Sequence, residues 1–469
     1  MLYKSTRGIS KQSDFKNVTL RGLAQDGGLY IPESWSSVGL NFKKSKLSFI
    51  EIANAVIRNF TGNCLTDEDL INLIDKSYSN FNTAEITPVK KLNKNSFILE
   101  LFHGPTLAFK DVALQFLGNI FQHFLEEDLK CLNIVGATSG DTGSAAIEAI
   151  KNNDRANIFI LHPYKRISDF QRRQMTTVKS KNVFNLAIKG NFDDCQNIVK
   201  KLFTDKDLNS RITLGSINSI NWTRIMAQIT YYIYAYYRLK QYNNNNEIAF
   251  SVPTGNFGDA YAGYLAKEKF KIPIKAIIVA TNQNDILHRF FKSGKYSKNK
   301  VFQTIAPSMD IQIASNFERL LFDIHSQDSS KVKKNMDEFK KNNFIQLDEV
   351  SVKKCKLSFE SYTISENQTI ETMKDIYKQT GEIIDPHTAI GIAAGKKYLN
   401  KHTKVDIVNL ATAHPIKFSN AVNLALGFDP PIPEKYIDIF AIDESYQVFE
   451  NDYSYIKDYI IRNSIAKDL

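Results

Sequence analysis

A single lysine, Lys110, lies within an apolar stretch of the sequence, in the segment LAFKDVA at 107–113. Lysine is strongly hydrated and seldom occupies apolar sequence for packing alone. Burial lowers the pKa of an amine and makes its neutral form available as a nucleophile or a base. The segment therefore predicts a reactive amine. The alternative is a surface lysine at a helix start, with Asp111 as its neighbour or as a helix cap.

Two glycine-containing loops, TSGDTG at 138–143 and TGNFGD at 254–259, each follow an apolar run and precede a helical pattern. Glycine lets the backbone approach a ligand closely, and the free N–H groups at a helix start favour an anion. Neither loop is a Walker A motif or a dinucleotide-binding fingerprint. The pair predicts a bound phosphate group, although glycine and aspartate also occur in such turns only to shape and cap them.

A reactive amine together with a phosphate-binding loop is the minimum equipment for pyridoxal 5'-phosphate. A third strand end, VDIVNLATAHPIKF at 405–418, supports this interpretation. Thr412 and His414 would emerge there beside a cofactor ring. His414 could equally be a structural histidine at the end of a strand.

The elements that must position these residues are short strands alternating with helices. Runs rich in Ile and Val occur at 96–101, 131–137, 157–162, 247–253, 274–280 and 404–411. Strands that are apolar on both faces and separated by helical patterns indicate a parallel α/β sheet, either one large sheet or two smaller ones. Helical spacing is also present at 48–60, at 67–78 and in the charged segment 329–344.

Composition limits the class of protein without choosing a function. The 469 residues carry a formal charge of +10, from 60 Lys and Arg against 50 Asp and Glu. No one-sided basic stripe or nucleic-acid-binding module accompanies this charge, so a nucleic-acid partner is not expected. The four cysteines are far apart and join no Cys/His cluster, which predicts a reducing compartment and no metal site. No secretory signal or membrane-spanning run is apparent, and a cytoplasmic enzyme is expected.

Read together, the motifs FHGPTLAFKD, ATSGDTGSAA, NSINWTR, VPTGNFGDAYAG and LATAHPIKF resemble, in this order, those of the threonine synthase family. The opening RGLAQDGGLYIPE is similar to that family's N-terminal domain, and the resemblance runs from about residue 3 to about residue 430. It implies an α/β fold of the fold-type II pyridoxal phosphate class, in which two α/β domains hold the cofactor in the cleft between them. A small N-terminal domain precedes them.

The resemblance also implies roles for individual residues. Lys110 matches the lysine that forms the Schiff base with the cofactor, and Thr412 matches the residue opposite the pyridine nitrogen. The cofactor phosphate is expected on the second loop, at Gly255, Asn256, Phe257, Gly258 and Asp259.

Substrate contacts are implied at two further segments and, with less support, at a third. The first glycine loop is expected near the substrate carboxylate, and the segment NSINWTR near the substrate phosphate, which arginine can bind bidentately. Arg224 could instead form an ordinary ion pair on a helix surface. The expected substrate-binding residues are Ser139, Gly140, Asp141, Thr142, Asn218, Ser219 and Arg224, with Lys165 added from HPYKRIS.

The family converts O-phospho-L-homoserine and water into L-threonine and phosphate by β,γ-elimination and addition of water at Cβ. The same motifs would fit a related phospholyase that releases 2-oxobutyrate and ammonia. The expected organisation is an N-terminal domain at 1–85, a core at 86–430 with a smaller lobe at roughly 112–240, and a C-terminal helical tail at 431–469. The sequence leaves a monomer or a homodimer open, and the segment 285–345 carries no motif that can be placed.

Overall fold

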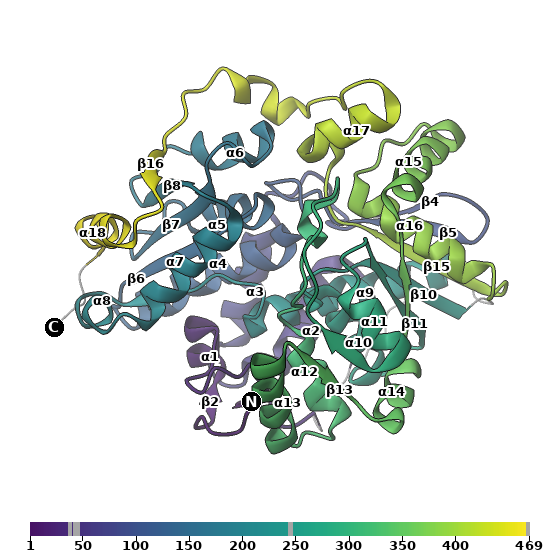
Figure 1. The fold of residues 1–469 in the computed structure, drawn as a ribbon, viewed down its shortest axis with the longest axis horizontal. Coiled ribbons are helices and arrows are strands. Elements are labelled where there is room, and N and C mark those ends of the chain that lie inside the picture. The colour runs from purple at the N-terminus through teal and green to yellow at the C-terminus, as the bar shows by residue number, and fades with distance from the viewer. Residues whose placement is uncertain (36–39, 41–46, 243–246, 466–469) are drawn as a thin grey trace.

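The computed structural model describes residues 1–35, 40, 47–242 and 247–465. Two α/β lobes lie side by side, and the start of a small N-terminal unit, in purple, lies beneath the smaller lobe (Figure 1). This unit contains the antiparallel sheet β2-β1-β3 and three helices. Its elements are β1 (Leu2–Ser5), β2 (Ser13–Asp14), α1 (Phe15–Arg21), β3 (Tyr30–Pro32), α2 (Phe49–Thr61) and α3 (Asp67–Tyr78).

The larger lobe is built on a six-stranded sheet in the order β14-β11-β10-β15-β5-β4. Its strands run parallel except that β4 pairs antiparallel with β5. The strands are β4 (Val89–Lys91), β5 (Ser96–Glu100), β10 (Glu247–Pro253), β11 (Ile274–Thr281), β14 (Phe359–Thr363) and β15 (Val405–Ala411).

Helices cover both faces of this sheet, which explains why its central strands β10, β11 and β15 are almost fully buried and largely apolar. Successive residues of a strand point to opposite faces. Ala249 and Ile278 accordingly pack with Ile390 of α16 (Pro386–Leu399), whereas Phe250 and Ile277 belong to the largest core. That core also takes in the N-terminal unit, α9 (Trp222–Tyr242), α10 (Gly258–Glu268), α11 (Ile286–Ser293), α12 (Phe317–Ile324) and α13 (Ser329–Asn342). The remaining elements of this lobe are β12 (Lys295–Ser297), η1 (Pro307–Met309), β13 (Phe344–Gln346), α14 (Glu349–Lys356), α15 (Glu366–Thr380), η2 (Pro415–Phe418) and α17 (Ser419–Leu426).

The smaller lobe is built on a parallel five-stranded sheet in the order β16-β8-β7-β6-β9. These strands are β6 (Leu132–Ala137), β7 (Ala156–Pro163), β8 (Val183–Lys189), β9 (Leu214–Gly215) and β16 (Gln447–Glu450). Its helices are α4 (Lys110–Glu127), which contacts both lobes, α5 (Asp141–Ile150), α6 (Asp169–Thr176), α7 (Phe192–Thr204) and α8 (Lys206–Arg211). All six strands expected from the Ile/Val-rich runs are present, within one or two residues of their expected ends.

The C-terminal segment connects the two lobes. It leaves the larger lobe at α17, continues through η3 (Glu434–Phe440) and reaches β16 and α18 (Tyr453–Asn463) on the smaller lobe (Figure 1). This segment was expected to form a helical tail, but it also supplies β16, which pairs with β8 in the sheet. Helix α9 falls within the range expected for the smaller lobe, roughly 112–240, but it packs against α2 and α10 as well as against α4.

Candidate active site

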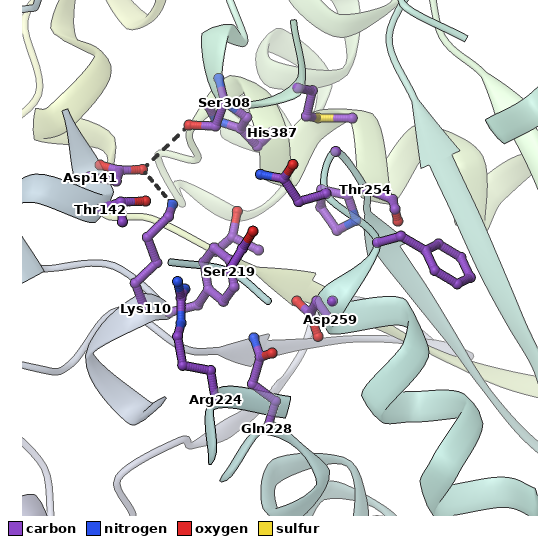
Figure 2. Close-up of a pocket in the computed structure, with 18 residues that line it drawn as sticks. Lys110, Asp141, Thr142, Ser219, Arg224, Gln228, Thr254, Asp259, Ser308 and His387 are labelled. Atoms are coloured by element: carbon purple, nitrogen blue, oxygen red, sulfur yellow. Dashed lines mark hydrogen bonds and ion pairs between the residues drawn. The ribbon is translucent and has the colours of Figure 1, made fainter. Parts of the chain in front are cut away.

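A cavity opens where the ends of β10 and β15 meet the starts of α4 and α5 (Figure 2). This is the edge at which the carboxyl ends of parallel strands place loops and helix N-termini together. Two glycine loops that lie more than 100 residues apart in the chain face each other across it. The cavity is lined by Phe109, Lys110, Asp141, Thr142, Ser219, Arg224, Gln228, Pro253, Thr254, Gly255, Asn256, Phe257, Gly258, Asp259, Ser308, Met309, His387 and Thr412.

Lys110 is the first residue of α4 and is only 9% exposed. The backbone before it is fixed to the end of β15, because the N–H of Phe109 donates to the carbonyl of Thr412 at 2.8 Å. The Lys110 Nζ donates to Asp141 Oδ2 at 3.2 Å across the cavity. The surface-lysine alternative therefore does not describe Lys110, whose amine is buried in the cavity wall. Asp111 caps nothing at the start of α4; it accepts the N–H and hydroxyl of Thr106.

The loop at 254–259 leads into α10. Its N-cap residue, Phe257, has a left-handed backbone (φ 65°) and makes no side-chain hydrogen bond to the helix. The first-turn N–H groups of α10 therefore adjoin the cavity without a side-chain cap, which is the arrangement that binds anions. Gly255 cannot be replaced freely, because a Cβ there would lie 2.8 Å from the Ser308 carbonyl oxygen. The Phe257 ring, buried beside Phe359, anchors the loop.

The opposite loop has the same design. Gly140 precedes α5 with φ 138° and no side-chain cap, and a Cβ there would lie 2.6 Å from the Gln171 side chain. The Thr138 hydroxyl accepts the N–H groups of Gly140 and Gly143 and so holds the turn. Two helix N-termini, one from each lobe, are thus directed toward one cavity.

Arg224, in the first turn of α9, is a buried cation for which the described part of the chain supplies no ion pair. It is 4% exposed, and its Nε and Nη1 have no hydrogen-bond partner among the described residues. Burial lowers its pKa to about 10, so the guanidinium remains charged at neutral pH. A buried charge of this kind is costly unless something pairs with it. Its side chain points into the cavity (Figure 2), where an anionic ligand would neutralise it.

Asp259 presents a carboxylate to the same cavity. Its Oδ1 accepts the hydroxyl groups of Tyr231 at 2.5 Å and Tyr232 at 2.8 Å, and its Oδ2 has no partner among the described residues. Burial raises the pKa of Asp259 to about 6, although these hydrogen bonds favour the charged form. The two tyrosines hold the Asp259 carboxylate in one orientation at the end of the loop at 254–259.

Four of the expected site residues do not line the cavity. Ser139 is exposed, and Gly140 lies behind the loop against Gln171. The Asn218 side chain stabilises a local turn, accepting from the Ile220 N–H and donating to Ser216. Lys165 is exposed on the turn after β7, with its Nζ over the Tyr164 ring.

Several residues that line the cavity were not predicted from the sequence motifs. Ser308 and Met309 come from η1, inside the segment 285–345 that matched no motif. Gln228 follows Arg224 by one helical turn, so the i, i+4 spacing could have revealed it. His387 lies in the sequence DPHT, in which Asp385 caps α16 and Pro386 occupies its first position. That pattern indicates a helix start and nothing more.

His387 and Asp385 support the η1 turn. The Asp385 Oδ1 lies 2.8 Å from His387 Nδ1, and His387 Nε2 accepts the Ser308 N–H at 3.2 Å. Both nitrogens of this histidine are therefore occupied. His414, the other candidate histidine, accepts the Ile416 N–H and packs edge-on against Phe102, outside the cavity lining. Burial lowers the pKa of His414 to about 4, and its role is structural.

These features fit pyridoxal 5'-phosphate. The cavity offers a buried amine at Lys110, an uncapped helix start at Gly258 whose glycine would not tolerate a side chain freely, and the Thr412 hydroxyl at the end of β15. A Cβ on Gly258 would lie 3.1 Å from Asn316 Nδ2. Arg224 remains as a second anion site, separate from the loop. The described residues contain no cluster of three or more His, Cys, Asp or Glu side chains that could hold a metal ion.

Comparison with known proteins covers nearly the whole chain. Residues 2–78 match the family "Threonine synthase N terminus", residues 83–412 match "Pyridoxal-phosphate dependent enzyme", and residues 388–460 match "Threonine synthase, C-terminal". Threonine synthase of Pseudomonas aeruginosa is 44% identical over 98% of both chains. That of Saccharomyces cerevisiae is 44% identical over 91% of this chain and 89% of its own. The structure of PLP-bound threonine synthase from Brucella melitensis superposes with a TM-score of 0.94 at 41% identity, over 99% of both chains.

Proposed function

The chain belongs to the threonine synthase family of pyridoxal-phosphate-dependent enzymes, and from that premise we propose how its residues divide the reaction. The reaction converts O-phospho-L-homoserine and water into L-threonine and phosphate by β,γ-elimination and addition of water at Cβ. Two phosphate groups must be bound in one cavity, one on the cofactor and one on the substrate. The cavity offers one anion site at the start of α10 and a second at Arg224.

We assign the cofactor to Lys110 and the residues across the cavity from it. The loop Gly255, Asn256, Phe257, Gly258 and Asp259 would hold the cofactor phosphate at the start of α10, and Thr412 would lie opposite the pyridine nitrogen. A hydroxyl at that position need not keep the nitrogen protonated. When bound, the cofactor supplies an electron sink for the electrons released at the substrate carbons.

The substrate is assigned to the facing side of the cavity. Arg224 would pair with the substrate phosphate, with Ser219 beside it and Asn218 shaping the turn, and this removes the buried unpaired charge. The first-turn N–H groups of α5, at Asp141 and Thr142, would bind the substrate carboxylate, with Ser139 and Gly140 shaping their loop. Lys165 stays a prediction for the outer part of the site, because it lies on an exposed turn.

Lys110 is assigned the proton transfers. Its amine can reach the substrate side from the start of α4 and lies within hydrogen-bond distance of Asp141, which holds a proton on the amine between transfers. General acid–base work of this kind typically contributes about 10²–10⁴-fold in rate. The observation that carries the whole assignment is the coincidence of a buried amine and a buried, unpaired guanidinium in one cavity.

The deciding experiment starts from the purified holoenzyme. We expect a visible absorbance band from the bound cofactor, a change in that band on adding O-phospho-L-homoserine, and threonine and phosphate as products. Formation of 2-oxobutyrate and ammonia instead would identify a phospholyase. No band and no product would refute the assignment altogether.

Lys110→Ala tests the assigned amine. We expect the variant to fold, to bind the cofactor without a reducible covalent link, and to lose turnover by at least about 10³-fold. Borohydride reduction followed by peptide mass spectrometry locates the link in the parent enzyme. Full turnover by Lys110→Ala, or a link at another lysine, would contradict the assignment.

The cellular setting and the assembly remain proposals as well. Cys64, Cys131, Cys195 and Cys355 form no disulfide bonds, and this supports the expected cytoplasmic location. None of the helices in the described residues is long and apolar enough to cross a membrane. Light scattering of the purified enzyme would separate the monomer from the homodimer.

A further inference from the structure

A second lysine, Lys417, is buried behind the cavity. It lies on η2 and is 0% exposed. Its Nζ donates to the Thr106 carbonyl at 2.7 Å and to Gln174 Oε1 at 2.6 Å, and lies 3.2 Å from Asp141 Oδ1. The three protons of the ammonium group thus face three fixed acceptors. Lys417 is not itself a cavity-lining residue.

Asp141 connects this lysine with Lys110. Its Oδ1 faces Lys417 and accepts the Gln171 Nε2–H at 2.8 Å, whereas its Oδ2 faces Lys110 at 3.2 Å and the Ser308 hydroxyl at 3.5 Å. Figure 2 shows the two contacts of Oδ2. One carboxylate therefore bridges two lysines, each on its own oxygen.

The two lysines differ in how firmly they are held. Lys417 is enclosed on every side, and its contacts come from α6 (Gln174), from α5 (Asp141) and from the turn before α4 (Thr106). Among the described residues Asp141 is the hydrogen-bond acceptor of Lys110, whose amine otherwise faces the cavity. When the Lys110 amine leaves to react, Asp141 keeps Lys417 as its counterion.

Electrostatics agrees with this division. Burial alone would raise the pKa of Asp141, but Lys110 and Lys417 together hold it well below its usual range. Burial lowers the pKa of Lys417, and this is opposed by Asp141 and Asp111. A buried carboxylate stripped of its partner would be strongly unfavourable. Lys417 therefore remains as a fixed cation beside the carboxylate while Lys110 is engaged.

We propose that Lys417 is a positioning residue for the reaction: it fixes the Asp141 carboxylate so that the Lys110 amine has a constant acceptor to leave and to return to. The inference rests on the proposed role of Lys110. It assigns no contact between Lys417 and substrate or cofactor.

The test is Lys417→Met, which keeps the length of the side chain and removes its charge. In the full-length protein freed of cofactor, reductive methylation at pH 8 is followed by mass spectrometry of the Lys110 peptide. Without Lys417, Asp141 pairs with Lys110 alone, so we expect Lys110 to be methylated about tenfold more slowly. In the holoenzyme we expect kcat to fall about tenfold or more, while KM for phosphohomoserine stays within about twofold because Arg224 is untouched.

Two comparisons separate positioning from mere structure. Lys417→Arg retains the charge and should recover most of the labelling rate. Lys267→Met removes another partly buried lysine, one that donates to the Lys275 and Leu357 carbonyls away from the cavity, and should change neither readout. A folded Lys417→Met protein with the parental labelling rate would overturn the proposal, even if turnover were lost, because the proposed site could then be correct without Lys417.

If the Lys417→Met protein does not fold, a second pair of variants tests the proposal. Asp141→Asn combined with Lys417→Met exchanges the buried ion pair for neutral groups, which proteins tolerate better than a broken pair. If Lys417 acts through Asp141, adding Lys417→Met to Asp141→Asn should change the Lys110 labelling rate by less than about twofold. A further tenfold change in that background would show that Lys417 acts by another route and would overturn the proposal.

Discussion

Arg224 carries a charge that no described residue neutralises through an ion pair. In the absence of a ligand this buried guanidinium opposes folding, while in the complex it is available for the substrate phosphate. The same side chain therefore destabilises the empty protein and supports binding, a trade-off that is common at ligand sites.

Arg224→Met should show both effects. We expect the free energy of unfolding of the protein without cofactor or phosphate to increase by about 1–3 kcal/mol, since an unsatisfied buried group disappears. We expect KM for phosphohomoserine to rise about a hundredfold, the loss of about 3 kcal/mol of charge-assisted binding. Denaturant titration and steady-state kinetics measure the two.

Arg172→Met is the matched control for that experiment. Arg172 pairs with Glu444 on the C-terminal segment, so its loss should lower stability and leave KM unchanged. An Arg224→Met protein that is less stable than the parent would show that Arg224 has a partner in the empty protein.

Asp259 gives a pH dependence whose sign follows from its burial. Its pKa is raised to about 6 in the folded protein, so the fold binds an extra proton between about pH 4 and pH 6. Because ionisation of the buried carboxyl opposes folding, the free energy of unfolding falls as the pH rises through that window. The full loss of stability is reached above about pH 6. We expect Asp259→Asn to match the parent at pH 4 and to be more stable at pH 8 by about 3 kcal/mol. Denaturant titrations at both pH values measure this, and a pH-independent difference would contradict it.

At the residue scale, site residues could be predicted from the sequence where a single segment contains the features that identify them. Lys110 was identifiable because a cation stood alone among apolar residues, and the structure confirms that it lies in the cavity wall. Ser308, His387 and Lys417 were not identifiable in this way. Ser308 and His387 reach the cavity through tertiary packing of segments with no unusual composition, whereas Lys417 lies inside the segment at 405–418 and the sequence lacked only its contact with Asp141, more than 270 residues away.

The loop before α10 is the element on which cofactor binding depends. Gly255→Ala would place a methyl group 2.8 Å from the Ser308 carbonyl oxygen, closer than any carbon tolerates, so the loop or η1 must shift. We expect the dissociation constant for pyridoxal 5'-phosphate to rise at least about tenfold, since displacement of a pre-organised anion site weakens its hydrogen bonds. Fluorescence titration with the cofactor measures this.

Gly136→Ala is the control for the loop. A Cβ at Gly136, in β6, would meet one side-chain atom at 3.4 Å, which is ordinary contact. It should leave cofactor affinity unchanged. Equal affinities for Gly255→Ala and the parent would mean that the loop does not hold the cofactor phosphate.

Strands that are buried in the structure were easier to predict from the sequence than strands at the sheet edges. Strands such as β10 and β15 are covered on both faces, so they appear in the sequence as continuous apolar runs. Strands β14 and β16 lie at sheet edges and are largely half-buried or exposed, so they carry polar residues and no run marked them. Thr412 and the two glycine loops were predictable because each directly follows a strand of the first kind.

At the scale of the whole molecule, the C-terminal segment completes the smaller lobe. Ile456 and Ile460 of α18 are fully buried in that lobe's core, and the Asn463 and Ile465 carbonyls accept hydrogen bonds from Asn157 and Asn133. We expect Ile456→Ala or Ile460→Ala to lower the free energy of unfolding by about 2–5 kcal/mol. Leu424→Ala, on an exposed position of α17, should change it by less than about 0.5 kcal/mol. Denaturant titration measures the free energy of unfolding of these variants. Equal effects of the three substitutions would show that the C-terminal segment does not contribute to the core of the smaller lobe.

The position of β16 also determines the order in which this protein can be completed on a ribosome. Lys189, on β8, is paired with Glu450, which is synthesised 261 residues later. At translation rates of about 5–20 residues per second, the interval is roughly 13–50 s. During it the nascent chain already contains Lys110 and acquires the loop at 254–259, while the edge of β8 stays open to any other strand. The strand that covers the edge of β8 is thus made long after β8 itself, and a chain released before it would carry the proposed cofactor residues with an unprotected edge.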